Sequence, residues 1–192
     1  GDAVIKELIP FIEKNFRVMK SPNARFLEGH SSGGWSALAL QIFYPDYFNG
    51  VWAGQPDPVD FRALESINVY ENSNAFFDTK GDARPSARED NGEVYSTVRD
   101  EVQMENAIAR GSIFTRSGGT WGAWNAVFGP RGTDGLPVPL WNPITGEIHE
   151  FARSYFSKYD LRKTLENNWK TMGPKLRGKI HIWVGDSDNF YL

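Results

Sequence analysis

A short glycine-rich segment between an apolar strand and an apolar helix limits what this chain can fold into. The segment is residues 29–34, with the sequence GHSSGG, and it follows residues 25–28, which have the pattern of the end of a buried strand. Residues 35–44 are almost continuously apolar and are closed by Pro45, as expected for a core helix. The pattern therefore predicts a sharp strand-to-helix turn.

This turn matches G-x-S-x-G, a pattern in which a serine occupies a strained position between strand and helix. In that register Ser31, rather than Ser32, is the candidate nucleophile, and Gly29 and Gly33 leave room for the turn. The backbone N–H of Ser32 is the candidate oxyanion donor, at the positive end of the helix. The alternative interpretation is an ordinary glycine-rich turn that is capped by the hydroxyl of Ser31 or Ser32.

Two further segments carry a family resemblance. They are ELIPFIEKNFR at residues 7–17 and YPDYFNG at residues 44–50. Together with the GHSSGG turn they resemble the esterase D-like branch of the α/β-hydrolases, which includes relatives of feruloyl and enterochelin esterases. The resemblance covers residues 1–60 and 176–192, and it implies an α/β-hydrolase fold of which this chain holds the part around the nucleophile, with helices on a mostly parallel sheet.

The resemblance also implies ester hydrolysis through an acyl-enzyme, a Ser, Asp, His triad in that chain order, and no metal or organic cofactor. In the family the acid follows the strand after the lid, and here Asp186 and Asp188 follow the predicted strand 179–184. A strand, a glycine and an aspartate three residues later is the family pattern, so we favour Asp188 and keep Asp186 as the alternative. Both aspartates could instead cap a turn, and they lack a third ligand at a metal-loop spacing.

The triad histidine has no match in the expected order, because it should follow Asp188 and the sequence ends at Leu192. We interpret His30 as a packing residue or a wall of the substrate pocket, and His181 as a buried, hydrogen-bonded residue of its strand. His149 reaches the site only if the middle region folds over it. We therefore expect the catalytic histidine beyond Leu192 and little turnover by this chain alone.

The amino-terminal part supports the interpretation as a fragment. A helix is expected at residues 2–16, kinked at Pro10, with an apolar stripe that would cover a sheet face. The turn follows so soon that no room remains for earlier strands or for the loop that supplies a second oxyanion N–H. A nucleophile strand left at a sheet edge would invite pairing, so we expect self-association.

Residues 71–170 are interpreted as a lid or insertion between two parts of the hydrolase core, 1–70 and 171–192. Three tryptophans of this region, Trp121, Trp124 and Trp141, could line a substrate pocket, or they could pack the lid onto the core. The expected elements are a strand at 50–54, a turn at 55–60, an irregular surface segment at 71–92, a helix at 98–110 stopped by Gly111, an aromatic-rich loop at 117–124, and a helix at 155–170 ended by Gly173 and Pro174.

The composition and net charge limit the kinds of molecule that the chain is expected to bind. The 192 residues include 21 basic and 24 acidic side chains, for a net charge of -3, so neither a nucleic-acid surface nor a polybasic membrane patch is expected. A small ester is the expected substrate, and no apolar run is long enough to span a membrane. Cysteine is absent, which leaves a cytoplasmic, secreted or periplasmic location open. An acyltransferase, a serine peptidase and a non-catalytic interaction module remain as alternatives on this fold.

Overall fold

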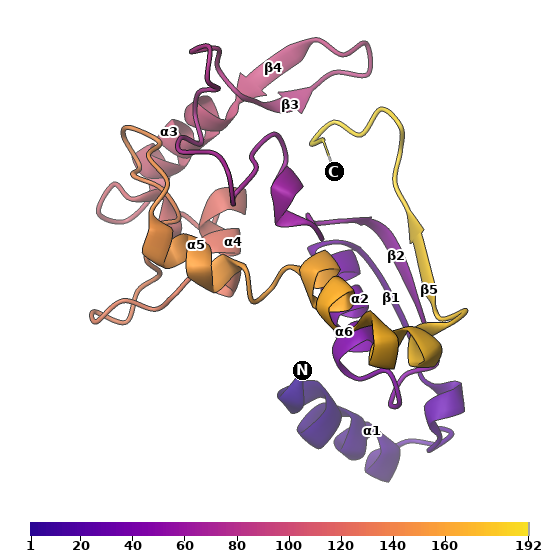
Figure 1. The fold of residues 1–192 in the computed structure, drawn as a ribbon. Coiled ribbons are helices and arrows are strands. Elements are labelled where there is room, and N and C mark those ends of the chain that lie inside the picture. The colour runs from indigo at the N-terminus through magenta and orange to yellow at the C-terminus, as the bar shows by residue number, and fades with distance from the viewer. Residues whose placement is uncertain (192) are drawn as a thin grey trace. The chain divides into compact units, whose positions relative to one another are not determined.

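The computed structural model describes residues 1–191, and these form two compact units (Figure 1). Unit 1 consists of residues 1–59 and 165–185. Unit 2 consists of residues 60–164 together with the residues from Asp186 on. The expected lid region, residues 71–170, is divided between the units. Residues 71–164 belong to unit 2, and residues 165–170 belong to unit 1.

Unit 1 contains a parallel three-stranded sheet. Its strands are β1 (Phe26–Ser31), β2 (Gly50–Pro56) and β5 (Ile180–Trp183), in the order β1-β2-β5. Helix α2 (Ser32–Phe43) follows β1 directly and packs on β1 and β2 (Figure 1). The strands and the helix around the GHSSGG segment therefore form where the sequence predicts them, and the mixed architecture with a parallel sheet confirms the α/β class.

The two faces of this sheet differ in how they are covered. Val51 and Ala53 of β2 are fully buried beneath α2, whereas Trp52, between them, points to the other face and is 39% exposed. His181 of β5 stacks on Trp52, with ring centroids 4.7 Å apart and 10° between the planes. The expectation that His181 is buried is wrong, because it lies on the open face of the sheet and is exposed.

The first helix contacts the rest of unit 1 through polar groups rather than through its apolar stripe. A π-helical turn (Val4–Leu8) leads into α1 (Ile9–Asn15), with Pro10 near the junction. The helix is tied to the rest of unit 1 by polar contacts, such as the 2.6 Å ion pair of Glu13 with Arg25. Phe11 and Phe16 are 60% and 62% exposed, so the apolar stripe does not cover a sheet face within the described residues, contrary to prediction.

Unit 2 combines short helices with a small hairpin. The helix expected at 98–110 is confirmed as α3, which starts with a capping box between Thr97 and Asp100 and is followed by Gly111 at φ +79°. The elements of this unit are a 3₁₀ turn (Phe61–Ala63), the antiparallel strands β3 (Pro85–Arg88) and β4 (Val94–Thr97), α3 (Val98–Ile108), a 3₁₀ turn (Phe114–Arg116), α4 (Thr120–Phe128) and α5 (Glu150–Phe156).

One prediction in this region is wrong and another holds only in part, because glycines and polar residues were taken as breakers. Much of the segment expected to be an aromatic loop, 117–124, is the first half of α4, in which a Cβ at Gly122 would lie 2.4 Å from the Phe114 carbonyl oxygen. This glycine allows close packing rather than ending a helix. The segment 71–92, expected to be an irregular surface excursion, contains β3 and the fully buried Phe76.

The single helix expected at 155–170 is two helices, α5 and α6 (Leu161–Leu176). Asp160 separates them, because its Oδ1 accepts the backbone N–H of Lys163 at 2.7 Å and so caps the start of α6. The predicted end at Gly173 and Pro174 is also wrong, since α6 continues to Leu176 with Pro174 inside its last turn. Pro174 has no N–H to donate to the carbonyl oxygen of Lys170, four residues earlier, so α6 gives up one intrahelical bond in its last turn.

Candidate functional site

The backbone at Ser31 is the most unusual feature of unit 1. Ser31 ends β1 with φ 54° and ψ -127°, outside the common regions for a residue with a side chain, and α2 begins at the next residue. The register with β2 shifts at the same point, so that His30 is paired with Gly54 but Ser31 with Pro56. The turn places Ser31 at the carboxyl edge of a parallel sheet, where it is exposed.

Close approach of the backbone makes this turn possible. A Cβ at Gly29 would lie 2.2 Å from the carbonyl oxygen of Gly33, which forbids any side chain there. The predicted need for glycine at Gly33 is not found, because among the described residues a Cβ there would meet no heavy atom within 4 Å apart from its chain neighbours and the backbone of its own helix. Gly34 takes this role instead, since its Cβ would lie 3.0 Å from the carbonyl oxygen of Gly54.

Asp57 is a site residue that the sequence interpretation missed. Its Oδ1 accepts the hydroxyl of Ser31 at 3.2 Å, and its Oδ2 accepts the hydroxyl of Ser32 at 2.6 Å. Its own backbone N–H donates to the Ser31 carbonyl oxygen at 3.2 Å. The residue is only 5% exposed. A buried carboxylate thus contacts both hydroxyls of the turn.

The signal for Asp57 was present in the sequence, but it was assigned to a turn. Asp57 stands between Pro56 and Pro58, directly after the strand that pairs with β1. In parallel strands the carboxyl ends meet at one sheet edge, so an acidic residue after β2 lies beside a serine at the end of β1. Applying this rule to every strand end would have identified it.

His30 lies on the open face of the sheet. Its ring meets Trp183 edge-on, with centroids 5.5 Å apart and 77° between the planes. Gly54 provides the space, because a Cβ there would lie 2.5 Å from Nδ1 of His30. Neither His30 nor His181, the two histidines of unit 1, hydrogen-bonds the Ser31 hydroxyl within the described part of the chain.

The remaining histidine, His149, belongs to unit 2. Its Nδ1 lies 3.1 Å from the carbonyl oxygen of Pro139, and it precedes α5 at the N-cap position. This contact is structural in character. The histidine expected beyond Leu192 lies outside the described residues.

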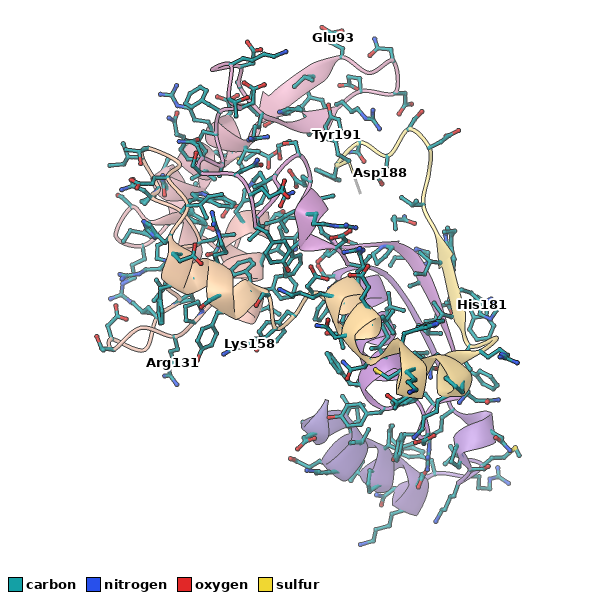
Figure 2. The ribbon with its side chains drawn as sticks, viewed as in Figure 1. Glu93, Arg131, Lys158, His181, Asp188 and Tyr191 are labelled. Carbon is teal, nitrogen blue, oxygen red and sulfur yellow. The ribbon has the colours of Figure 1, made fainter. Side chains whose placement is uncertain are left out.

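The two aspartates proposed for the acid role belong to unit 2. Figure 2 shows Asp188 in the segment after β5. The Oδ1 of Asp188 accepts the backbone N–H of Phe190 at 2.9 Å, as in an Asx turn, and Asp186 is exposed. Arg88 of β3 holds the segment, since its Nε donates to the Asp188 carbonyl oxygen and its backbone N–H to that of Asn189, both at 3.0 Å. The Arg88 guanidinium also lies 4.5 Å from the centre of the Tyr191 ring.

The three tryptophans considered for the substrate pocket are part of the core of unit 2. Trp121 and Trp141 are fully buried and Trp124 is 6% exposed. The Trp121 and Trp141 rings meet with centroids 5.1 Å apart, and Nε1 of Trp121 donates to Glu101 at 3.0 Å. This burial favours the packing interpretation.

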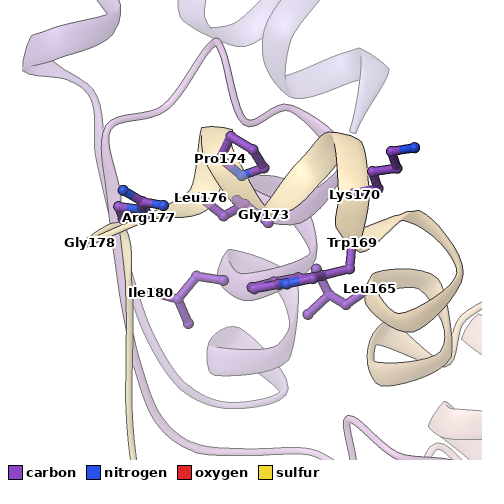
Figure 3. A pocket seen from close by; sticks show the side chains of 9 residues that line it. All are labelled: Leu165, Trp169, Lys170, Gly173, Pro174, Leu176, Arg177, Gly178 and Ile180. Atoms are coloured by element: carbon purple, nitrogen blue, oxygen red, sulfur yellow. The ribbon is translucent and has the colours of Figure 1, made fainter.

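Each unit also carries a groove that Ser31 does not line. The groove in unit 1 measures about 640 Å³ and runs between the end of α6 and the start of β5, with the Trp169 ring lying between Leu165 and Ile180 (Figure 3). The groove in unit 2 measures about 500 Å³ and is lined by α3 residues and Phe190. Ser31 lines neither groove, so the chemistry expected of Ser31 does not belong to them.

Among residues 1–191, no group of three or more His, Cys, Asp or Glu side chains is arranged to hold a metal ion. The helices in the same range include none that is both long enough and apolar enough to cross a membrane.

Comparison with known proteins identifies the family. The family model described as "Putative esterase" matches residues 2–190, which is nearly the whole chain. A search of curated proteins finds no match. The family match agrees with the parallel sheet, the strand-to-helix turn at Ser31 and the resemblance of the segments around it. The chain belongs to this esterase family of the α/β-hydrolase superfamily.

Proposed function

We propose that the chain hydrolyses carboxylic esters with Ser31 as the nucleophile. The observation that carries this proposal is the conformation of Ser31, an exposed serine with a positive φ of 54° between a parallel strand and a helix. Strained residues of this kind persist where the surrounding structure fixes them, and they cluster at active sites. The match to an esterase family gives the reaction class.

In the proposed reaction Oγ of Ser31 attacks the carbonyl carbon of the ester. The bond to the alcohol breaks, the alcohol leaves with the proton from the serine hydroxyl, and an acyl-enzyme remains. Water then attacks the acyl-enzyme, which releases the acid and restores the hydroxyl. We propose the N–H of Ser32 as one donor to the oxyanion, because the first N–H groups of a helix lack intrahelical partners and carry its positive end.

We also propose Asp188, with Asp186 as the alternative, as the acid that orients a triad histidine. The position of Asp188 after β5 supports this role, and its hydrogen bond from Phe190 supports the alternative role of a turn cap. Because neither histidine of unit 1 bonds Ser31, we expect slow turnover from this chain. General bases of this kind accelerate such reactions by roughly 10²–10⁴-fold.

A fluorophosphonate probe tests the nucleophile without requiring turnover. Attack on phosphorus also requires removal of the serine proton, so we expect slow covalent labelling at the peptide that contains Ser31, located by mass spectrometry, and no labelling of Ser31→Ala. Ser36→Ala is the matched control, because Ser36 lies on the exposed side of the same helix and its hydroxyl donates to the Ser32 carbonyl oxygen at 2.8 Å. Equal labelling of the natural chain and Ser31→Ala would refute the proposal.

A further inference from the structure

The environment of Ser31 contains a buried charge that the proposed reaction does not require. Asp57 is 5% exposed, and both of its carboxylate oxygens face hydroxyl groups of the turn. Pro56 and Pro58 on either side restrict its backbone. The carboxylate is therefore held in place by its own chain as well as by its partners.

An ionised carboxylate only accepts hydrogen bonds, so both serine hydroxyls must donate to it. The hydrogen on Oγ of Ser31 then points toward Asp57, and the oxygen lone pairs point elsewhere. The bond to Ser31, at 3.2 Å, is longer than the bond to Ser32, at 2.6 Å. The weaker bond is the one that has to break when Ser31 reacts.

The same carboxylate places a negative charge beside the reacting atom. Its contact with Ser32, the first residue of α2, puts it at the positive end of that helix, which stabilises the charge in the folded protein. In a partly buried site such a charge repels a second negative charge more strongly than it would in water. A substrate with an anionic acyl group close to the scissile carbonyl is therefore disfavoured.

We propose that Asp57 is a positioning and specificity residue of this site: it orients the Ser31 hydroxyl and selects esters whose acyl group carries no negative charge. The inference rests on the proposed function of Ser31 and adds the substrate class to it. Selection against a charge of the wrong sign is a general route to specificity.

The test compares two fluorophosphonate probes, one with a neutral alkyl chain and one with a carboxylate on a chain of similar length. We expect the natural chain to react faster with the neutral probe, by on the order of tenfold. In Asp57→Asn, which keeps the side-chain shape without the charge, the ratio of the two rates should fall toward one. Asp57→Ser, which offers a neutral hydroxyl, should show the same fall, so the inference does not depend on the folding of a single variant.

Asp46→Asn is the matched control. It removes the same charge from the same unit, but Asp46 lies just beyond the opposite end of α2 and its side chain is 72% exposed. We expect the rate ratio of this variant to equal that of the natural chain. Circular dichroism and thermal unfolding establish that each variant compared is folded.

The outcomes separate the inference from the proposed function. If the natural chain labels at Ser31 and the rate ratio is the same in folded Asp57→Asn and Asp57→Ser, the role of Asp57 is wrong and the nucleophile stands. If the natural chain labels no faster than Ser31→Ala, both proposals are overturned.

Discussion

Around Ser31 the chain packs backbone against backbone, whereas around Trp141 it packs ring against ring. In the first region a Cβ at Gly29 would meet the Gly33 carbonyl group. In the second, the Trp141 ring lies 5.7 Å from Phe114 and 5.1 Å from Trp121. In the first region an atom added at Gly29 would clash with the backbone. In the second region the removal of a ring would leave a cavity. The reaction is proposed for the region that is built without bulky side chains.

The largest combined effect, on both the proposed site and stability, is expected from adding one methyl group to the turn. Gly29→Ala places Cβ 2.2 Å from the Gly33 carbonyl oxygen, so the turn must open. We expect loss of labelling at Ser31 and a loss of unfolding free energy of about 3 kcal/mol or more, above the usual cost of overpacking because the clash is with backbone. Denaturant unfolding measures the stability, and the fluorophosphonate probe measures the turn.

Gly33→Ala is the control for this comparison. Its Cβ would meet no heavy atom of the described residues within 4 Å, and alanine favours the helix by about 1 kcal/mol over glycine. We expect stability equal to or above that of the natural chain, with labelling retained. If both variants lose labelling equally, the importance of backbone approach at Gly29 is refuted.

The second effect tests ring packing at another cluster of unit 2, formed by Phe61, Phe128 and Phe156. Phe156 of α5 is fully buried against Phe61 and Phe128, with centroids 5.8 Å and 5.9 Å away. We expect Phe156→Ala to cost about 3–5 kcal/mol of unfolding free energy. Phe151, on the same helix, is 61% exposed, so Phe151→Ala should cost less than about 1 kcal/mol. Similar losses in the two variants would contradict the assignment of the core.

The smallest effect is expected from Tyr70→Phe, which removes a hydroxyl group and keeps the aromatic ring. The Tyr70 hydroxyl donates to Oδ2 of Asp160 at 2.6 Å, and Asp160 is 1% exposed. Burial, followed by the hydrogen bond to Asp160, raises the pKa of Tyr70. We expect Tyr70→Phe to lose about 1–2 kcal/mol at neutral pH, because a buried carboxylate then lacks one donor.

The direction of the pH dependence follows from the raised pKa of Tyr70. Folding favours the neutral phenol, so this stabilisation is fully present below the usual tyrosine pKa of about 10 and is lost as pH rises beyond it. The difference between the natural chain and Tyr70→Phe should therefore shrink above about pH 10. Tyr95→Phe is the control, because Tyr95 is 56% exposed. A constant difference from pH 7 to 11 would exclude this linkage.

The two regions also differ in how far the sequence predicts them. The turn depends on residues that are neighbours in the chain, so the GHSSGG pattern located β1, α2 and Ser31 directly. Asp57 was missed because its role depends on the pairing of β1 with β2, about 25 residues later.

Elsewhere in both units the local rules failed where tertiary packing overrides them. Gly122 looked like a loop residue, but it lies in α4 where only a glycine fits beneath Phe114. Pro174 looked like a helix end, but it lies inside α6. His181 looked buried because it alternates with apolar residues in a strand, and the alternation cannot say which face of a sheet is covered.

The strained backbone of Ser31 limits which substitutions at position 31 can make the protein more stable and keep the proposed activity. A residue with a side chain at φ 54° and ψ -127° raises the energy of the folded state, and glycine at this position would relieve that strain. Stability and the proposed role of the hydroxyl therefore favour different residues at position 31. Improving the fold at position 31 would remove the group on which the proposed chemistry depends, so any search for a more stable version of this chain has to leave that position unimproved.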